Sequence, residues 1–142
     1  MTSPPYIVVD ASVAVKWILP ESGRTASLAL LRGFVEGQSV LLAPRTLTEE
    51  VASAMCKRFR RKQLTAEQVR VAFDYFQQRR PVLVDDPGLL GEAHDLSLRH
   101  RLSLWDCLYL ALAMRHRCNL VTADQRLVRS ASRHYPFVEL IA

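Results

Sequence analysis

The chain has 142 residues, of which 49% are hydrophobic and 23% charged, and its formal net charge is +5. This length suits one domain with a single core, so we expect residues 1–142 to form one domain. The composition excludes an intrinsically disordered chain, and the sequence has no run of about 18 apolar residues that could span a membrane. The basic balance favours a polyanionic partner such as a nucleic acid.

The N-terminal residues and the cysteines indicate a cytoplasmic location. The first six residues lack the basic and then apolar plan of a secretory signal. Cys56, Cys107 and Cys118 are odd in number and lack metal-ligand spacing, which is typical of reduced thiols packed as small hydrophobic side chains. We therefore expect a cytoplasmic protein that does not enter a membrane.

The first predicted element is a short strand of β-branched residues at 7–9, followed by Asp10 and Ser12. Such a run is typical of a strand buried on both faces of a parallel sheet. A helix is predicted from Val13 to Leu19, so Asp10 lies in a strand-to-helix turn. It can cap that helix, or it can face the carboxyl edge of the sheet, where open α/β sheets bind ligands.

Helices and strands alternate through the rest of the chain. Apolar spacing and start signals predict helices at 24–36, 46–61, 65–79, 86–100, 104–114 and 125–130. Short apolar runs predict strands at 40–43, 81–84, 119–122 and 137–141, the last of them at the sheet edge. Capping boxes are predicted at 46–49, 65–68 and 103–106, and Asp86 with Pro87 predicts a helix start. This alternation predicts an α/β fold, a parallel sheet with helices on both faces.

Four acidic residues fall at the edge where the predicted strands end. Asp10 and Asp124 each follow a strand, and Glu50 and Asp106 lie in the first turns of helices that begin at the same edge. Three of them have a structural alternative, because Asp10 and Asp124 can cap helices and Asp106 can belong to a capping box. Glu50 has no such structural alternative. It lies at the edge of the apolar stripe of its helix, whereas Glu49 points away from that stripe.

Carboxylates gathered in a partly desolvated cleft repel one another, and a divalent cation relieves that repulsion. Oxygen-only ligands suit Mg²⁺, with Mn²⁺ as the alternative. Carboxylate-bound metal on a basic protein indicates phosphodiester hydrolysis by an activated water. We predict that Asp10, Asp106 and Asp124 hold the metal, while Glu50 orients the attacking water or a second ion.

A basic run follows Glu50 on the same predicted helix. It consists of Lys57, Arg58, Arg60, Arg61 and Lys62, with Phe59 inside it. Such a run is either a solvated surface or a groove for RNA backbone in which Phe59 stacks on a base, and both readings stay open. Lys16 and Trp17 are further candidates for contact with RNA.

The segments that carry the four acids resemble those of the PIN-domain nucleases, and within them the toxins called VapC. The resemblance rests on residues 9–17, 50–55, 103–113 and 120–124, which come in the family's order and spread over nearly the whole chain. It implies a PIN-like three-layer fold, with a five-stranded parallel sheet flanked by helices, and Mg²⁺- or Mn²⁺-dependent cleavage of RNA. It also implies an acidic site of Asp10, Glu50, Asp106 and Asp124, with Ser12 and Thr122 as hydroxyl helpers.

The same resemblance implies a toxin role, a small cognate antitoxin that blocks the site, and a homodimer. Two departures from the family pattern are Ser53, where Asn is frequent, and Cys107, where Ala is common; neither touches the acids. Three rival functions remain: an RNA-processing nuclease of PIN type outside a toxin system, a metal-dependent phosphatase, and an RNA-binding module without catalysis. The last predicts salt-sensitive RNA binding that is indifferent to loss of the acids.

Overall fold

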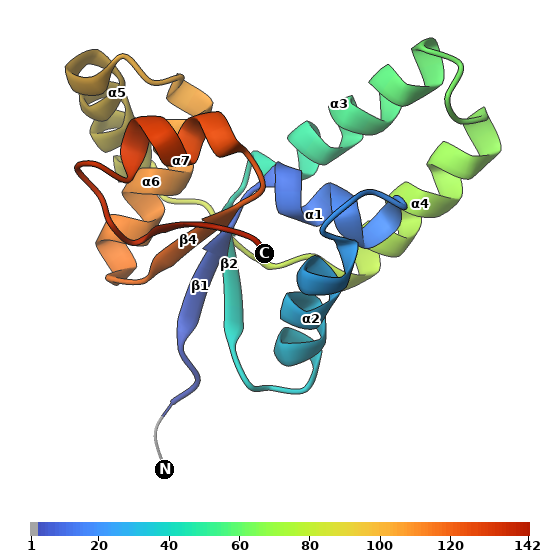
Figure 1. Ribbon diagram of the computed structural model, residues 1–142, viewed down its shortest axis with the longest axis horizontal. Helices are drawn as coiled ribbons and strands as arrows, with labels where there is room; N and C mark the ends of the chain where they lie inside the picture. The colour runs from blue at the N-terminus through green and yellow to red at the C-terminus, as the bar shows by residue number, and fades with distance from the viewer. Residues whose placement is uncertain (1–2) are drawn as a thin grey trace.

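Five short apolar runs form one parallel sheet in the computed structural model, which describes residues 3–142 (Figure 1). The strands are β1 (Tyr6–Val9), β2 (Val40–Pro44), β3 (Val82–Val84), β4 (Asn119–Thr122) and β5 (Val138–Leu140). Their order is β3-β2-β1-β4-β5, and each neighbouring pair is parallel. This confirms the predicted five-stranded parallel sheet and the edge position of the last strand.

Within residues 3–142, seven helices flank the sheet, with α1–α4 to one side of the view in Figure 1 and α5–α7 to the other. They are α1 (Ala11–Ile18), α2 (Arg24–Val35), α3 (Leu47–Arg60), α4 (Ala66–Arg79), α5 (Gly88–His100), α6 (Leu104–His116) and α7 (Gln125–Ala131). The predicted helices all exist, with ends that differ by at most two residues. No helix in the described part of the chain is long and apolar enough to cross a membrane.

The helix caps confirm the predictions from the sequence in part. Thr65 and Gln68 form the predicted capping box of α4. Thr46 makes no side-chain capping bond, because its backbone is already helical (φ −67°, ψ −11°), so the box predicted there is wrong. Asp86 accepts a hydrogen bond from the backbone N–H of Gly88 at 2.9 Å, but the N-cap of α5 is Pro87, so the predicted helix start with Asp86 as cap and Pro87 in the first turn is wrong by one residue.

The centre of the core is α6, whose seven residues from Cys107 to Ala113 are all buried, as its apolar sequence predicts. Its neighbours are the central strands β1 and β2 and the helix α5. The prediction that all three cysteines pack as hydrophobic residues is wrong for Cys56, which is exposed on α3. Cys107 is buried and Cys118 is partly buried.

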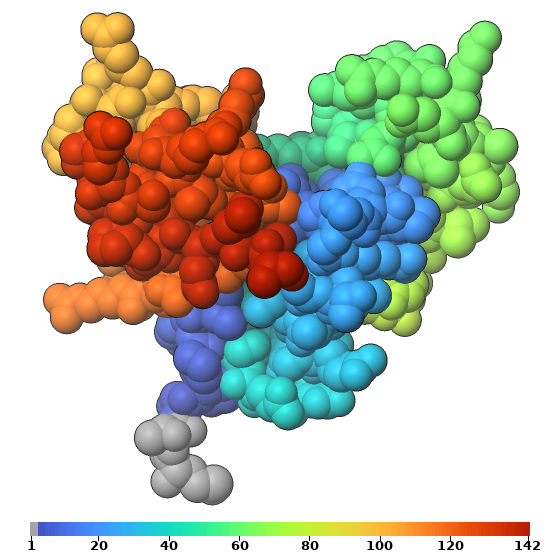
Figure 2. All heavy atoms as spheres, in the orientation of Figure 1, coloured from blue at the N-terminus to red at the C-terminus, as the bar shows by residue number. Residues whose placement is uncertain are grey.

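Helices α3 and α4 form a hairpin that projects from the sheet, and Figure 2 shows a hollow between it and the body formed by α5, α6 and α7. The hairpin is fastened at its base by Phe76 of α4, which is 1% exposed. The Phe76 ring packs against Trp17 of α1, with 6.4 Å between the ring centroids, and against Phe73 at 6.1 Å. Phe76 therefore fixes the hairpin to α1, the helix that follows Asp10.

Replacing Phe76 with alanine should lower the free energy of unfolding by about 3–5 kcal/mol, since a buried aromatic ring is lost and a cavity is left. Urea unfolding followed by circular dichroism measures this loss. Phe59→Ala, on the same hairpin but 49% exposed, is the matched control and should change stability by less than about 1 kcal/mol. Equal losses in the two variants would contradict the assigned packing.

Candidate active site

The candidate site begins with Asp10, which follows the central strand β1 directly. Strands β1 and β4 pair in parallel with Val9 opposite Val121, so Asp10 and Thr122 come next on either side of the same edge. The Asp10 carboxylate is 7% exposed and Thr122 is fully buried. The register of two strands therefore brings together residues that are 112 positions apart.

Three hydrogen bonds hold the Asp10 carboxylate. It accepts from the hydroxyl of Ser12 at 2.5 Å, from the hydroxyl of Thr122, and from the backbone N–H of Val13 at 3.3 Å. The Ser12 hydroxyl also accepts from the backbone N–H of Ala123 at 2.8 Å, which ties the turn after β1 to the turn after β4. Asp10 thus caps α1 and faces the sheet edge at once, so the two alternatives posed by the sequence are both true.

Asp124 and Asp106 approach the same edge from the starts of two helices. Asp124 caps α7, its Oδ1 accepting from the backbone N–H groups of Arg126 at 2.9 Å and Leu127 at 3.3 Å. Asp106 lies in the first turn of α6, where the Ser103 hydroxyl accepts from its backbone N–H at 3.0 Å. Only this half of the predicted capping box forms, which leaves the Asp106 carboxylate free to face the other acids.

Burial and mutual repulsion raise the pKa of three of the four acids. Burial raises the pKa of Asp10 from 3.8 to about 6, and the charge of Asp106 adds to the rise. Burial also raises the pKa of Glu50 from 4.5 to about 7, against the hydrogen bond from Tyr109 and with the charges of Asp10 and Asp106. The pKa of Asp106 is raised by burial and by Asp124. The structure therefore brings all four predicted acids into one electrostatic cluster.

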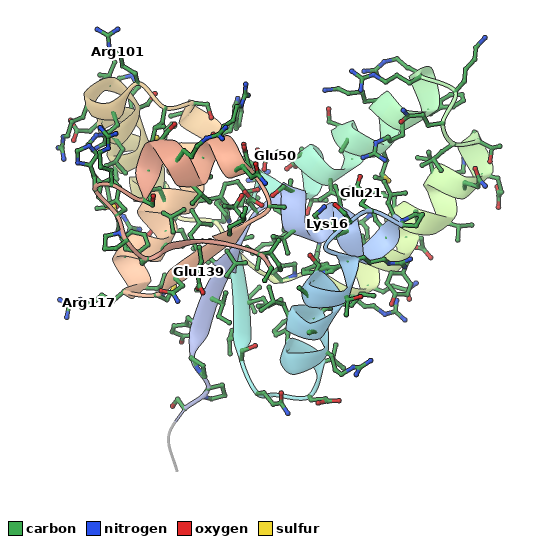
Figure 3. The ribbon with its side chains drawn as sticks, viewed as in Figure 1. Lys16, Glu21, Glu50, Arg101, Arg117 and Glu139 are labelled. Atoms are coloured by element: carbon green, nitrogen blue, oxygen red, sulfur yellow. The ribbon has the colours of Figure 1, made fainter. Side chains whose placement is uncertain are left out.

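Glu50 lies at the base of the hollow between the α3–α4 hairpin and the α5–α7 body (Figure 3). Its carboxylate accepts a hydrogen bond from the hydroxyl of Tyr109 on α6. The sequence reading placed Tyr109 only within a buried helix and missed this contact. The available signal was its spacing, since Tyr109 lies three residues after Asp106 and therefore on the same helix face.

The donor set suits a hard divalent cation, because it consists of carboxylates and hydroxyls. The charge of Arg126 acts to lower the pKa of Asp106, but burial and Asp124 keep that pKa above its ordinary value. Within residues 3–142, no three His, Cys, Asp or Glu side chains are already grouped closely enough to hold an ion. The capping role of Asp124 explains part of this, since one of its oxygens is directed to backbone N–H groups. The chemistry of the site fits a metal, while the ligand shell is not preformed.

The basic run lies away from the acids, at the far end of α3. Ten residues separate Glu50 from Arg60, about 15 Å along a helix. Arg58 differs from the rest of the run because it pairs with Glu21 in the α1–α2 loop, which Lys16 also contacts at 3.4 Å. Burial alone would raise the pKa of Glu21, but the two cations hold it below its ordinary value.

The other four basic residues of the run, Lys57, Arg60, Arg61 and Lys62, are exposed, and so is Phe59. Trp17 is 2% exposed and donates its indole N–H to the carbonyl of Ser27 at 2.8 Å, so it cannot stack on a base. Figure 3 places Lys16 and Glu21 together beside α1. The side chains of Lys16 and Arg58 are therefore engaged within the protein.

Comparison with known proteins identifies the family of this chain. Residues 7–132 match the model of the PIN domain. Ribonuclease VapC1 of Mycobacterium tuberculosis is 34% identical over 125 residues, which cover 84% of this chain and 86% of that protein.

Two solved structures share the fold. VapC20 of Mycobacterium tuberculosis, described as a sarcin-ricin loop cleaving toxin, matches with a TM-score of 0.64 and 15% identity, over 88% of this chain and 95% of that one. VapBC2 from Rickettsia felis, bound to a DNA fragment from its promoter, matches with a TM-score of 0.66 and 15% identity, over 95% of this chain and 96% of that one. The family match and the identity to VapC1 show that this chain belongs to the PIN domain family, in its VapC branch.

Proposed function

We propose that the chain is a metal-dependent endoribonuclease and the toxin of a toxin–antitoxin pair. The observation that carries the proposal is the buried Asp10 carboxylate, whose pKa is raised by burial and by the neighbouring charge of Asp106. Buried carboxylates that lie close together repel one another unless a cation lies between them. Carboxylates that hold a metal ion are the arrangement that metal-dependent phosphodiester cleavage uses. The name of VapC1 as a ribonuclease and the description of VapC20 as a cleaving toxin support the same activity.

Asp10, Asp106 and Asp124 would hold Mg²⁺ or Mn²⁺, which when bound neutralises charge on the phosphate and makes water a better nucleophile. Ser12 and Thr122 keep the Asp10 carboxylate in one orientation by hydrogen bonds to it. Glu50, with a pKa of about 7, accepts a proton from the water that attacks the phosphorus.

The exposed basic residues at the hairpin tip are proposed to bind the RNA backbone, with Phe59 stacking on a base. Lys57, Arg60, Arg61 and Lys62 remain candidates for direct contact. Arg58 is better assigned to fixing the hairpin, since it is paired with Glu21.

A small antitoxin is the proposed protein partner, blocking the acids with a basic side chain, and the VapBC2 assembly supports such a pairing. A homodimer is proposed on the family resemblance.

An RNA-processing nuclease outside a toxin system would use the same acids. A neighbouring antitoxin gene would favour the toxin role over this alternative.

Asp10→Asn should abolish cleavage while keeping the fold, because the amide oxygen can still cap α1 but cannot bind a cation as the carboxylate does. We expect a rate at least about 100-fold lower on a labelled cellular RNA pool with Mn²⁺ or Mg²⁺. Asp95→Asn, which changes an exposed acid paired with Arg99, is the matched control and should cut normally. Full activity in a folded Asp10→Asn protein would rule out the assigned site.

The stability of the metal-free protein should fall as the pH rises from about 4 to about 6. Folded Asp10 has a pKa of about 6 against 3.8 for the unfolded chain, so the folded state binds the proton more tightly and is favoured at the lower pH. This group alone makes a difference on the order of 3 kcal/mol, and Glu50 acts in the same direction up to about pH 7.

Urea unfolding of the wild-type protein and of Asp10→Asn, each with EDTA, isolates this effect from other titrating groups. The variant should be the more stable protein at pH 7 and should lose that advantage at pH 4. Added Mn²⁺ should stabilise the wild type and not the variant. A stability difference that does not change with pH would contradict the buried, repelling state of Asp10.

Arg60→Gln should raise the KM for RNA and leave kcat unchanged, if the hairpin tip binds phosphate. The slope of log affinity against log salt should become shallower by about 0.7, the value for one phosphate contact on a single strand. Arg32→Gln, an exposed arginine on α2, is the control and should change neither quantity. Identical salt slopes in the wild type and Arg60→Gln would show that the tip is an ordinary solvated surface.

A further inference from the structure

Tyr109 is a polar side chain with a buried ring in the middle of the candidate site. It lies on α6 and is 2% exposed, within the core that α6 forms with β1 and β2. Its hydroxyl donates to Oε2 of Glu50, which is 59 residues away on α3. Because Asp106 lies one helical turn earlier on the same face, α6 directs both a carboxylate and a hydrogen-bond donor toward the acids.

Two features of the site favour movement of the Glu50 carboxylate away from the Tyr109 hydroxyl. The charges of Asp10 and Asp106 both repel it. A cavity of about 610 Å³ opens beside it, lined also by Glu49 and Ser53, and gives the side chain space to turn toward water. In the described part of the chain, the Tyr109 hydroxyl is the hydrogen-bond partner of this carboxylate, and Oε1 has none.

We propose that Tyr109 is a positioning residue for the cleavage reaction, holding Oε2 of Glu50 so that Oε1 is directed at the attacking water. The inference rests on the proposed nuclease function and assigns to it a residue on the core helix. Tyr109 acts through Glu50, so its contribution to the rate should disappear when Glu50 no longer acts as a base.

Tyr109→Phe removes the hydroxyl and keeps the ring. We expect kcat to fall about 10- to 100-fold with KM for RNA unchanged, as for loss of a hydrogen bond to a charged group. The matched control is Tyr135→Phe, which removes a hydroxyl bonded at 2.8 Å to His100, the last residue of α5, and should cut like the wild type. Thermal unfolding of both variants shows that each is folded.

A double-mutant cycle with Glu50→Gln separates positioning from a structural role. The double variant Glu50→Gln/Tyr109→Phe should be no slower than Glu50→Gln alone. A further loss in the double variant would overturn the inference, since Tyr109 would then act independently of Glu50. A Tyr109→Phe protein that cuts at the wild-type rate would also overturn it and would leave the nuclease proposal intact.

A measurement on the metal-free protein tests the contact without any activity. The ¹³C resonance of the Glu50 side-chain carboxyl, assigned by its loss in Glu50→Gln, should shift in Tyr109→Phe and stay in place in Tyr135→Phe. An unshifted resonance in Tyr109→Phe would overturn the inference. A wild-type protein that shows this contact but cuts no RNA would overturn the nuclease proposal, and the assigned role of Tyr109 with it.

Discussion

The Asp10 carboxylate lies 7% exposed at the end of the central strand, where it loses most of its hydration on folding. Three hydrogen bonds compensate for that loss: two come from the first turn of α1, from the Ser12 hydroxyl and the Val13 backbone N–H, and one comes from Thr122 on β4. This requirement fixes the register of β1 against β4, because a slip of one residue would turn Thr122 to the other face of the sheet. The surrounding architecture therefore serves to keep one charged group both buried and hydrogen-bonded.

The same burial makes the site a source of instability. Asp10, Asp106 and Asp124 each raise the pKa of another acid of the cluster. At neutral pH the folded chain therefore holds charges that are better solvated in the unfolded chain. The apolar packing of α6 against the sheet offsets this cost, with Leu110 and Leu112 fully buried. Functional sites commonly carry such conflicts, since groups arranged for reactivity are not arranged for stability.

The fold could be predicted largely from the sequence, because buried parallel strands and amphipathic helices have distinct apolar spacing. The acids could be predicted as well, since Asp10 and Asp124 follow strands and parallel strands end at one edge. The contact of Tyr109 could not, because its spacing from Asp106 indicates a shared helix face but not the carboxylate that its hydroxyl meets on another helix. The engagement of Arg58 by Glu21 was missed for the same reason: long-range ion pairs depend on how the hairpin folds back over α1.

The pairing of β1 with β4 also orders events during synthesis. Asp10 leaves the ribosome before Thr122 and Asp124, which follow more than 110 positions later. Until they emerge, the Asp10 carboxylate lacks its hydrogen bond from Thr122, the acidic cluster lacks Asp124, and the central strand lacks β4 on one edge. The acidic cluster therefore assembles only after Asp124 has been translated, so under the proposed function a shorter nascent chain has no complete site with which to cut the messenger that encodes it.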